Sequence, residues 1–171
     1  TKANGSKLAD LFPENPLPLE TNEGLEMLLK ADPAAAEAHS GIVFLSDGAL
    51  APITGEISTF YAVASINATP GEWTNGALTF RQTLPVGRYA VVGARCIAAN
   101  GVAFRFVPIG YPYRPGGICS QALNDLESPY QRNGKMGAWF EFDSVNPPSL
   151  DILASDTCTS QVLLIDMIKV A

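Results

Sequence analysis

The chain has one histidine, which matters because a Ser-His-Asp or Cys-His arrangement needs a histidine as its base. His39 lies in the polar run Glu37-Ala38-His39-Ser40, at the end of an expected short helix. A solvated or helix-capping histidine fits this place better than a catalytic base. The sequence also contains no GxSxG, P-loop or GxGxxG motif. We therefore predict no catalytic residue and no cofactor, and expect that the protein is not an enzyme.

Two carboxylates have the spacing of a glycosidase pair on one face of a strand. Glu141 and Asp143 are two residues apart and so point the same way. Their aromatic neighbours Phe140 and Phe142 alternate onto the opposite face, where they cannot form a sugar platform beside the acids. This pattern favours a solvated outer strand face over a catalytic cleft.

Metal-binding patterns are equally sparse. Asp151 and Asp156 could contribute to a Ca²⁺ site, but no acidic loop has the density of such sites. Cys96, Cys119 and Cys158 are 23 and 39 residues apart, which fits no CxxC pattern. We predict no metal site and expect Cys96 and Cys158 to be buried. One disulfide between two of the three cysteines stays open as an alternative.

The segment Tyr111-Pro112-Tyr113-Arg114-Pro115-Gly116-Gly117 is the most unusual local feature. Tyrosine and arginine beside proline make a stiff, amphipathic surface, a composition favoured at protein interfaces. A packed crossover and a sugar-binding site are the alternatives. The amino-terminal segment is also richer in apolar residues than a free linker. The candidate assembly interface therefore comprises Leu11, Phe12, Leu17, Leu19, Tyr111, Tyr113 and Arg114.

Composition excludes several classes. The 171 residues suffice for one domain, and 47% hydrophobic with only 16% charged residues excludes bulk disorder. The net charge of −6, with arginines and lysines scattered singly, argues against direct nucleic-acid binding. No apolar stretch approaches the length of a transmembrane helix, so we expect no transmembrane segment. Targeting stays open.

The elements that position these residues change character at Gly41. Residues 1–21 contain three prolines and are expected to form an extended arm. Residues 22–40 carry helical spacing and capping signals, which predict two short helices, from Asn22 to Lys30 and from Asp32 to about Ser40.

Residues 41–171 are predicted to form the β-sandwich domain. Their period of two predicts about eight strands: Ile42–Ser46, Ile57–Ile66, Ala77–Gln82, Arg88–Ala98, Val102–Ile109, Ala138–Asp143, Leu150–Leu153 and Ser160–Val170.

The connections between strands suggest how they are arranged. Asn100-Gly101 has the composition of a type I′ turn, which predicts a hairpin from Arg88 to Ile109. Residues 110–136 are expected to be irregular. The last strand is apolar on both faces around Asp166 and should be central or covered. Without crossover helices, the fold class is all-β: an antiparallel β-sandwich, with a jelly roll as the leading topology.

Four segments, in their order along the chain, resemble the jelly-roll coat proteins of tailless icosahedral viruses, including phages. These segments are LTFRQTLPVGRYAVVGARC, VAFRFVPIGYPYRPGG, KMGAWFEFDS and QVLLIDMIKV. The resemblance covers about residues 40 to 171 and is one of pattern, with no active site to carry over. It implies a structural capsid subunit of the virion that contacts copies of itself and other capsid proteins. The amino-terminal arm would reach a neighbour or an underlying layer.

One departure concerns the arm. Many coat proteins that contact the genome directly have a strongly basic arm, whereas residues 1–21 hold only Lys2 and Lys7 against three acids. The resemblance then implies that another component neutralises the genome, such as an internal membrane or a second protein. Two other classes stay open: a secreted, extracellular carbohydrate-binding or adhesin-like sandwich, and a small enzyme of unrecognised mechanism.

Overall fold

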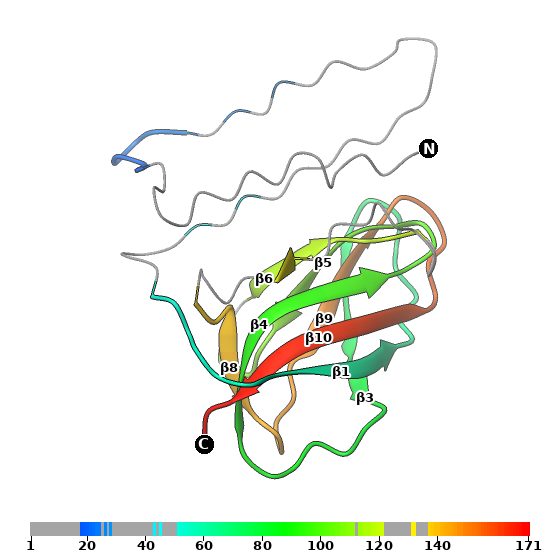
Figure 1. Ribbon diagram of the computed structural model, residues 1–171. Coiled ribbons are helices and arrows are strands. Elements are labelled where there is room, and N and C mark those ends of the chain that lie inside the picture. Colours follow the sequence, from blue (N-terminus) through cyan, green and yellow to red (C-terminus); the bar gives the residue numbers. More distant parts are fainter. Residues whose placement is uncertain are drawn as a thin grey trace.

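β-branched and aromatic residues at a period of two dominate the second half of the chain, and the computed structural model is all-β (Figure 1). The structure describes residues 18–24, 26, 28, 43, 45, 51–111, 113–121, 131–132 and 137–171, and these contain no helix. Accordingly, no helix in the described part has the length and apolar character needed to cross a membrane.

The described strands form two antiparallel sheets. One has the order β3-β1-β10-β4, with both β7 and β8 paired to β4, and comprises β1 (Ile57–Ala64), β3 (Thr79–Phe80), β4 (Arg88–Ile97), β7 (Gln131–Arg132), β8 (Phe140–Asp143) and β10 (Gln161–Lys169). The other has the order β2-β9-β5-β6 and comprises β2 (Trp73–Ala77), β5 (Gly101–Val107), β6 (Arg114–Ile118) and β9 (Ser149–Ala154).

The core lies between the two sheets, which face each other in Figure 1. Phe104 and Phe106 of β5 are almost fully buried, and their rings meet edge to face. Phe140 of β8 packs against Phe106 from the opposite sheet, with ring centroids 5.2 Å apart. Alternate residues point outward, so Glu141 is exposed on the outside and pairs with Arg88. The two antiparallel sheets therefore enclose an aromatic core in a sandwich-like arrangement, which is compatible with the β-sandwich that the alternation predicts.

The last strand is central, as expected from its apolar character on both faces. β10 pairs with β1 on one side and β4 on the other. It begins at the fully buried Gln161, whose side-chain amide accepts a bond from Ile66 N and donates to Ile66 O. Buried polar groups need such partners, and this amide thereby ties the β1–β2 connection to the start of β10.

The predicted hairpin from Arg88 to Ile109 is wrong. β4 and β5 follow each other, but β4 belongs to the six-stranded sheet and β5 to the four-stranded sheet. Asn100 has a φ of 62°, whereas Gly101 does not have the positive φ of a type I′ turn. Gly101 N donates to Ala98 O, and this bond with positive φ at the third residue is typical of a type II turn. The chain reverses direction here while passing from one sheet to the other.

The predicted helix from Asn22 to Lys30 is absent from its described residues. Thr21 and Asn22 form a turn, and Glu23, Gly24, Glu26 and Leu28 are not helical. Leu28 is 94% exposed, so it lacks the packing that a short amphipathic helix needs in water. The predicted helix from 32 to 40 and most of the arm lie outside the described residues.

The other predicted strands fare differently. Six correspond closely to β1, β4, β5, β8, β9 and β10. Of the predicted strand from Ala77 to Gln82, only Thr79 and Phe80 form a strand of their own, β3. Ala77 is instead the last residue of β2. Val43 and Leu45, the described residues of the strand expected over Ile42–Ser46, are exposed and outside any strand. The stretch 110–136 is less irregular than expected, since it contains β6 and β7.

Candidate interaction surface

Three predicted interface residues, Tyr111, Tyr113 and Arg114, lie in the β5–β6 connection or at the start of β6, and each tyrosine stacks on an arginine. Tyr111 and Tyr113 are 52% and 53% exposed, and Arg114 is half-buried. The Arg114 guanidinium carbon lies 4.2 Å from the centre of the Tyr111 ring. Leu19 is exposed as well. Leu11, Phe12 and Leu17 lie outside the described residues.

Tyr113 takes part in a second stack that the sequence does not reveal. Arg105 projects from the outer face of β5, and its guanidinium carbon lies 4.0 Å from the centre of the Tyr113 ring and 4.2 Å from that of Trp73. Trp73 is at the start of β2, two strands away across β9. Two exposed aromatic rings thus flank one arginine on the outside of the four-stranded sheet.

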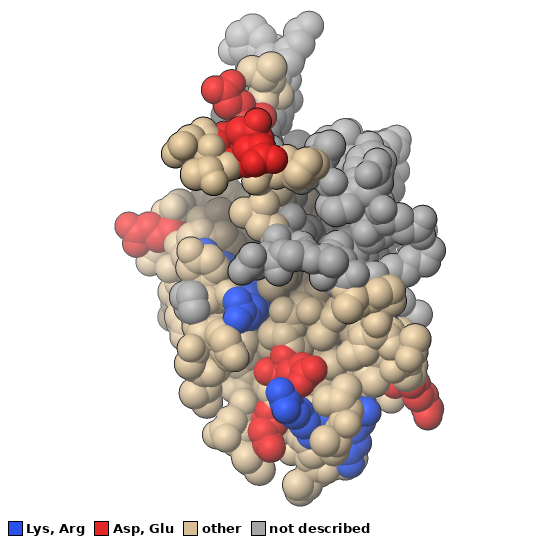
Figure 2. Space-filling model, turned by 90° about the vertical axis from the view of Figure 1, so that its left-hand side faces the viewer, with Lys and Arg blue, Asp and Glu red and all other residues tan. Residues whose placement is uncertain are grey.

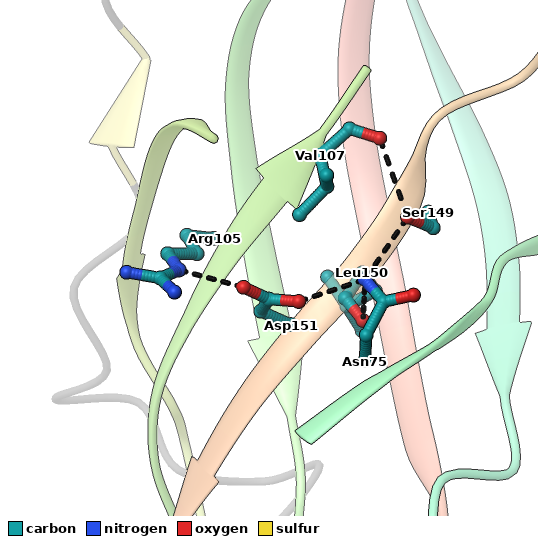
Figure 3. Close-up of polar contacts among 6 residues, drawn as sticks. All are labelled: Asn75, Arg105, Val107, Ser149, Leu150 and Asp151. Carbon is teal, nitrogen blue, oxygen red and sulfur yellow. Dashed lines mark hydrogen bonds and ion pairs between the residues drawn. The ribbon is translucent and has the colours of Figure 1, made fainter. Parts of the chain in front are cut away.

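A row of polar side chains crosses this sheet at Arg105 (Figure 3). The strand register aligns Asn75 of β2 with Asp151 of β9, and Asp151 with Arg105 of β5. Arg105 Nε donates to Asp151 Oδ2 at 2.8 Å, and Asn75 Nδ2 donates to Asp151 Oδ1 at 2.7 Å. Both carboxylate oxygens of Asp151 therefore have a hydrogen-bond partner.

The row continues toward the end of the sheet. Asn75 Nδ2 is also within 3.0 Å of Ser149 Oγ, and Ser149 Oγ donates to Val107 O (Figure 3). Asp151 is buried although it points to the outer face, because Arg105 and Asn75 cover it. Pairing on both oxygens compensates the cost of burying its charge. The arrangement holds the Arg105 side chain in one orientation.

Sequence reasoning missed Trp73, Asn75 and Arg105 as site residues. Arg105 alternates with two buried phenylalanines, which does predict an outward side chain. Asp151, a candidate Ca²⁺ ligand in the sequence, bonds to Arg105 and Asn75. The described residues contain no group of three or more acidic, histidine or cysteine side chains placed to hold a metal. Contacts between residues 73, 105 and 113 depend on strand order, which no local pattern reveals.

The three cysteines are buried and unpaired by disulfides. Burial raises the pKa of the Cys96 thiol well above its ordinary value, and a hydrogen bond with Cys119 adds to this shift. Cys158 accepts a hydrogen bond from Gln161 Nε2 at 3.3 Å. Cys96 and Cys158 are therefore buried as predicted, and Cys119 is buried too.

A hollow of about 320 Å³ opens at the edge of the core beside β1 and β10. Phe60, Tyr89 and Met167 form its apolar floor, and Glu56 and Lys169 stand at its rim. Tyr89 donates its hydroxyl to Pro85 O, so this polar group is already satisfied within the chain. The outer face of the four-stranded sheet, where side chains converge from three elements, is the stronger candidate site.

Charges of both signs are scattered over the face shown in Figure 2, with uncharged surface between them. No single-sign patch of described residues dominates that face, which agrees with the scattered arginines and lysines in the sequence. Comparison with known proteins gives no matching family model, no significantly similar curated protein and no significantly similar solved structure.

Proposed function

We propose that the two sheets form a jelly roll. Without the two-residue strands β3 and β7, eight described strands remain, and the pairs are β1 with β10, β2 with β9, β4 with β8 and β5 with β6. The first strand thus pairs with the last, the second with the second last, and so on inward. This nested pairing supports the proposal, because a jelly roll is one long antiparallel hairpin rolled into two sheets.

On this fold we propose that the protein is a structural subunit of a viral capsid, located in the virion, that self-assembles through lateral contacts. Its partners are copies of itself and other capsid proteins, without direct contact to nucleic acid. The nested strand pairing supports the resemblance to coat proteins. Fold alone does not assign function, so the argument for assembly depends on the surface.

The observation that carries the assembly proposal is a set of apolar loop tips at one end of the sandwich. Val86, Ile109 and Val145 are 80%, 70% and 69% exposed. Ser144 N donates to Gly87 O, which places the β3–β4 and β8–β9 loops together at the lower end in Figure 1. The ladder pair Val107–Ser149 brings the β5–β6 connection to the same end.

This exposure favours a subunit over an isolated monomer. Exposed apolar side chains at neighbouring loop tips are typical of surfaces that are covered in a complex. Tyr111 lies in the same β5–β6 connection as Ile109 and adds an aromatic anchor. We therefore assign this end of the sandwich, together with Tyr113 and Arg114, to the lateral contact.

Sedimentation velocity of the full-length protein at increasing concentration tests the proposal. The double variant Val86→Ser, Val145→Ser should lower the assembled fraction while the thermal midpoint stays unchanged. Glu72→Ser, on an exposed loop residue outside these tips, is the control and should assemble normally. Deleting residues 1–20 should also leave a folded sandwich that assembles poorly. A full-length protein that stays monomeric at high concentration would reject assembly.

The second candidate is a secreted carbohydrate-binding or adhesin-like module. The observation that favours it is the pair of exposed rings, Trp73 and Tyr113, beside the polar Asn75 and Arg105. Aromatic faces next to hydrogen-bonding groups suit a small ligand with apolar and polar parts. Retention of the protein on a polysaccharide gel, lost in Trp73→Ala, would favour this candidate over the capsid subunit.

A further inference from the structure

The guanidinium of Arg105 is held by three neighbours, on its two faces and at Nε. Trp73 and Tyr113 flank it, and its Nε is bonded to Asp151. Among the residues that the structure describes, no hydrogen-bond partner is found for its terminal nitrogens Nη1 and Nη2. In Figure 3 one of these two nitrogens points away from Asp151. The Arg105 side chain, which is 26% exposed, thus carries four N–H donors that no described residue accepts, and its orientation is fixed.

A fixed arginine binds with less loss of entropy than a free one. A surface arginine must give up rotamer freedom before it can hold a ligand in one geometry. The two rings and the Asp151 bond already restrict the side chain of Arg105. A ligand that engages the Nη pair therefore meets a preorganised donor fork.

The groups that Arg105 offers are all hydrogen-bond donors, because a guanidinium has N–H groups and no acceptor. One of these donors is used by Asp151, which is buried and bonded to Arg105 Nε. The remaining donors favour a ligand that accepts hydrogen bonds, and an anion accepts them more strongly than a neutral group.

The shape of the site selects among anions. A carboxylate accepts two parallel bonds from the Nη pair in the plane of the guanidinium. A planar carboxylate therefore fits between the two flanking rings in the plane of the guanidinium. A phosphate or sulfate is tetrahedral, so some of its oxygens would extend out of this plane toward the rings. We propose that Arg105, Trp73 and Tyr113 form a binding site for a carboxylate group, carried by an acidic side chain of a second copy of the chain or by a carboxylated sugar.

Acetate is the probe for the site itself. Titration with sodium acetate, against sodium chloride at equal ionic strength, should shift the NMR signals of the Trp73 indole N–H and the Arg105 Nε–H in a saturable way. Arg105→Lys keeps the charge but loses the planar fork, and should weaken acetate binding by about tenfold or more. Arg88→Lys changes an exposed arginine that also pairs with a carboxylate, and should leave acetate binding unchanged.

Further arms identify the source of the carboxylate. If a second copy supplies it, acetate should dissociate the self-associated protein, and Arg105→Lys should associate poorly. If a sugar supplies it, glucuronate should bind more tightly than acetate, glucose should not bind, and self-association should be unaffected. A monomeric protein that binds acetate would reject the assembly proposal and leave this site intact.

Three results would overturn the site: no saturable shift with acetate, equal acetate affinity in Arg105→Lys, or sulfate or glucose binding as tightly as acetate. Circular dichroism and the thermal midpoint check that Arg105→Lys is folded. If it is not, Tyr113→Leu removes one flanking ring on an exposed residue and should weaken acetate binding without loss of structure.

Discussion

Two arginine–carboxylate pairs of almost equal length allow the effect of burial to be separated from that of distance. Arg105 Nε is 2.8 Å from Asp151 Oδ2, and Arg88 Nε is 2.7 Å from Glu141 Oε2. The side chains of the first pair are 26% and 11% exposed, and those of the second pair are 62% and 35% exposed. Water screens the second pair more strongly, so the two pairs should differ in energy.

Double-mutant cycles measure this difference. We expect Arg105→Met with Asp151→Ala to give a coupling free energy of about 1.5 to 3 kcal/mol, as for hydrogen bonds to charged groups. Arg88→Met with Glu141→Ala should give about 0.2 to 1 kcal/mol, the range of exposed pairs. Each cycle cancels what a single substitution removes elsewhere, such as the ring contacts of Arg105, and so isolates the pair.

Urea unfolding at pH 7 is the suitable assay, because guanidinium chloride would itself screen the charges. Each cycle should be measured at low salt and at about 1 M NaCl, where the Debye length falls to about 3 Å. The coupling of the exposed pair should then approach zero, while the Arg105–Asp151 coupling should largely persist. Equal couplings for the two pairs, or loss of the Arg105–Asp151 coupling in salt, would refute the reasoning.

Four further predictions concern the core. Phe106→Ala should lower the free energy of unfolding by about 3 to 5 kcal/mol, because this ring is fully buried. Gly116→Ala should cost about 3 kcal/mol or prevent folding, because the added Cβ would lie 1.9 Å from Phe104 O. Since burial raises the pKa of Cys96, and its bond to Cys119 raises it further, the thiol should resist an aromatic disulfide reagent until the protein unfolds. The contribution of the Cys96 thiol to the free energy of unfolding should be fully present below the pKa of about 8.5 that the thiol has in the unfolded chain. It should decrease as the pH rises from there toward the higher pKa of the folded protein.

Denaturant unfolding and thiol-labelling kinetics check these outcomes. Tyr111→Ala, at an exposed site, is the control for Phe106→Ala and should change stability by less than about 0.5 kcal/mol. Rapid labelling of Cys96 in the native protein would contradict its burial. A fully stable Gly116→Ala variant would show that the β5–β6 ladder can move apart.

Local periodicity predicted β8 and β10 well. In β8 the buried Phe140 and Phe142 alternate with exposed acids, and the apolar character of β10 on both faces matches its central place. These signals are strong because a strand with one or both faces in the core shows that burial in its pattern of apolar and polar residues. The turn at Asn100 and the strands on either side of it were also located correctly. Their predicted pairing is wrong, since a reversal of direction leaves open whether the next strand joins the same sheet or the opposite one.

Apart from the two-residue β7, the strands that sequence reasoning missed are the two outer strands of the four-stranded sheet. β2 reads WTNGA and β6 reads RPGGI, and both contain residues that are unfavourable in central strands. An edge strand tolerates them: the ladder of β5 and β6 shifts register between Arg105 and Phe106, so that Pro115 has no partner, and Gly116 passes close to the backbone of β5. Breaker residues here mark an edge and not a loop.

The interaction surface was missed for the same reason as these edges. Trp73 belongs to β2 and Tyr113 directly precedes β6, whereas Arg105 and Asp151 lie on the two strands between them. Each ring reaches Arg105 only because the edge strands are present and in register. A variant that loosens an edge without touching the site, such as Gly76→Val on β2, where a Cβ would lie 2.5 Å from Ile66 Cγ1, should therefore displace Trp73 from Arg105. Weaker acetate binding in this variant, with the Tyr113 stack intact, would show that the sheet edge positions the site, and unchanged binding would show that Tyr113 alone suffices.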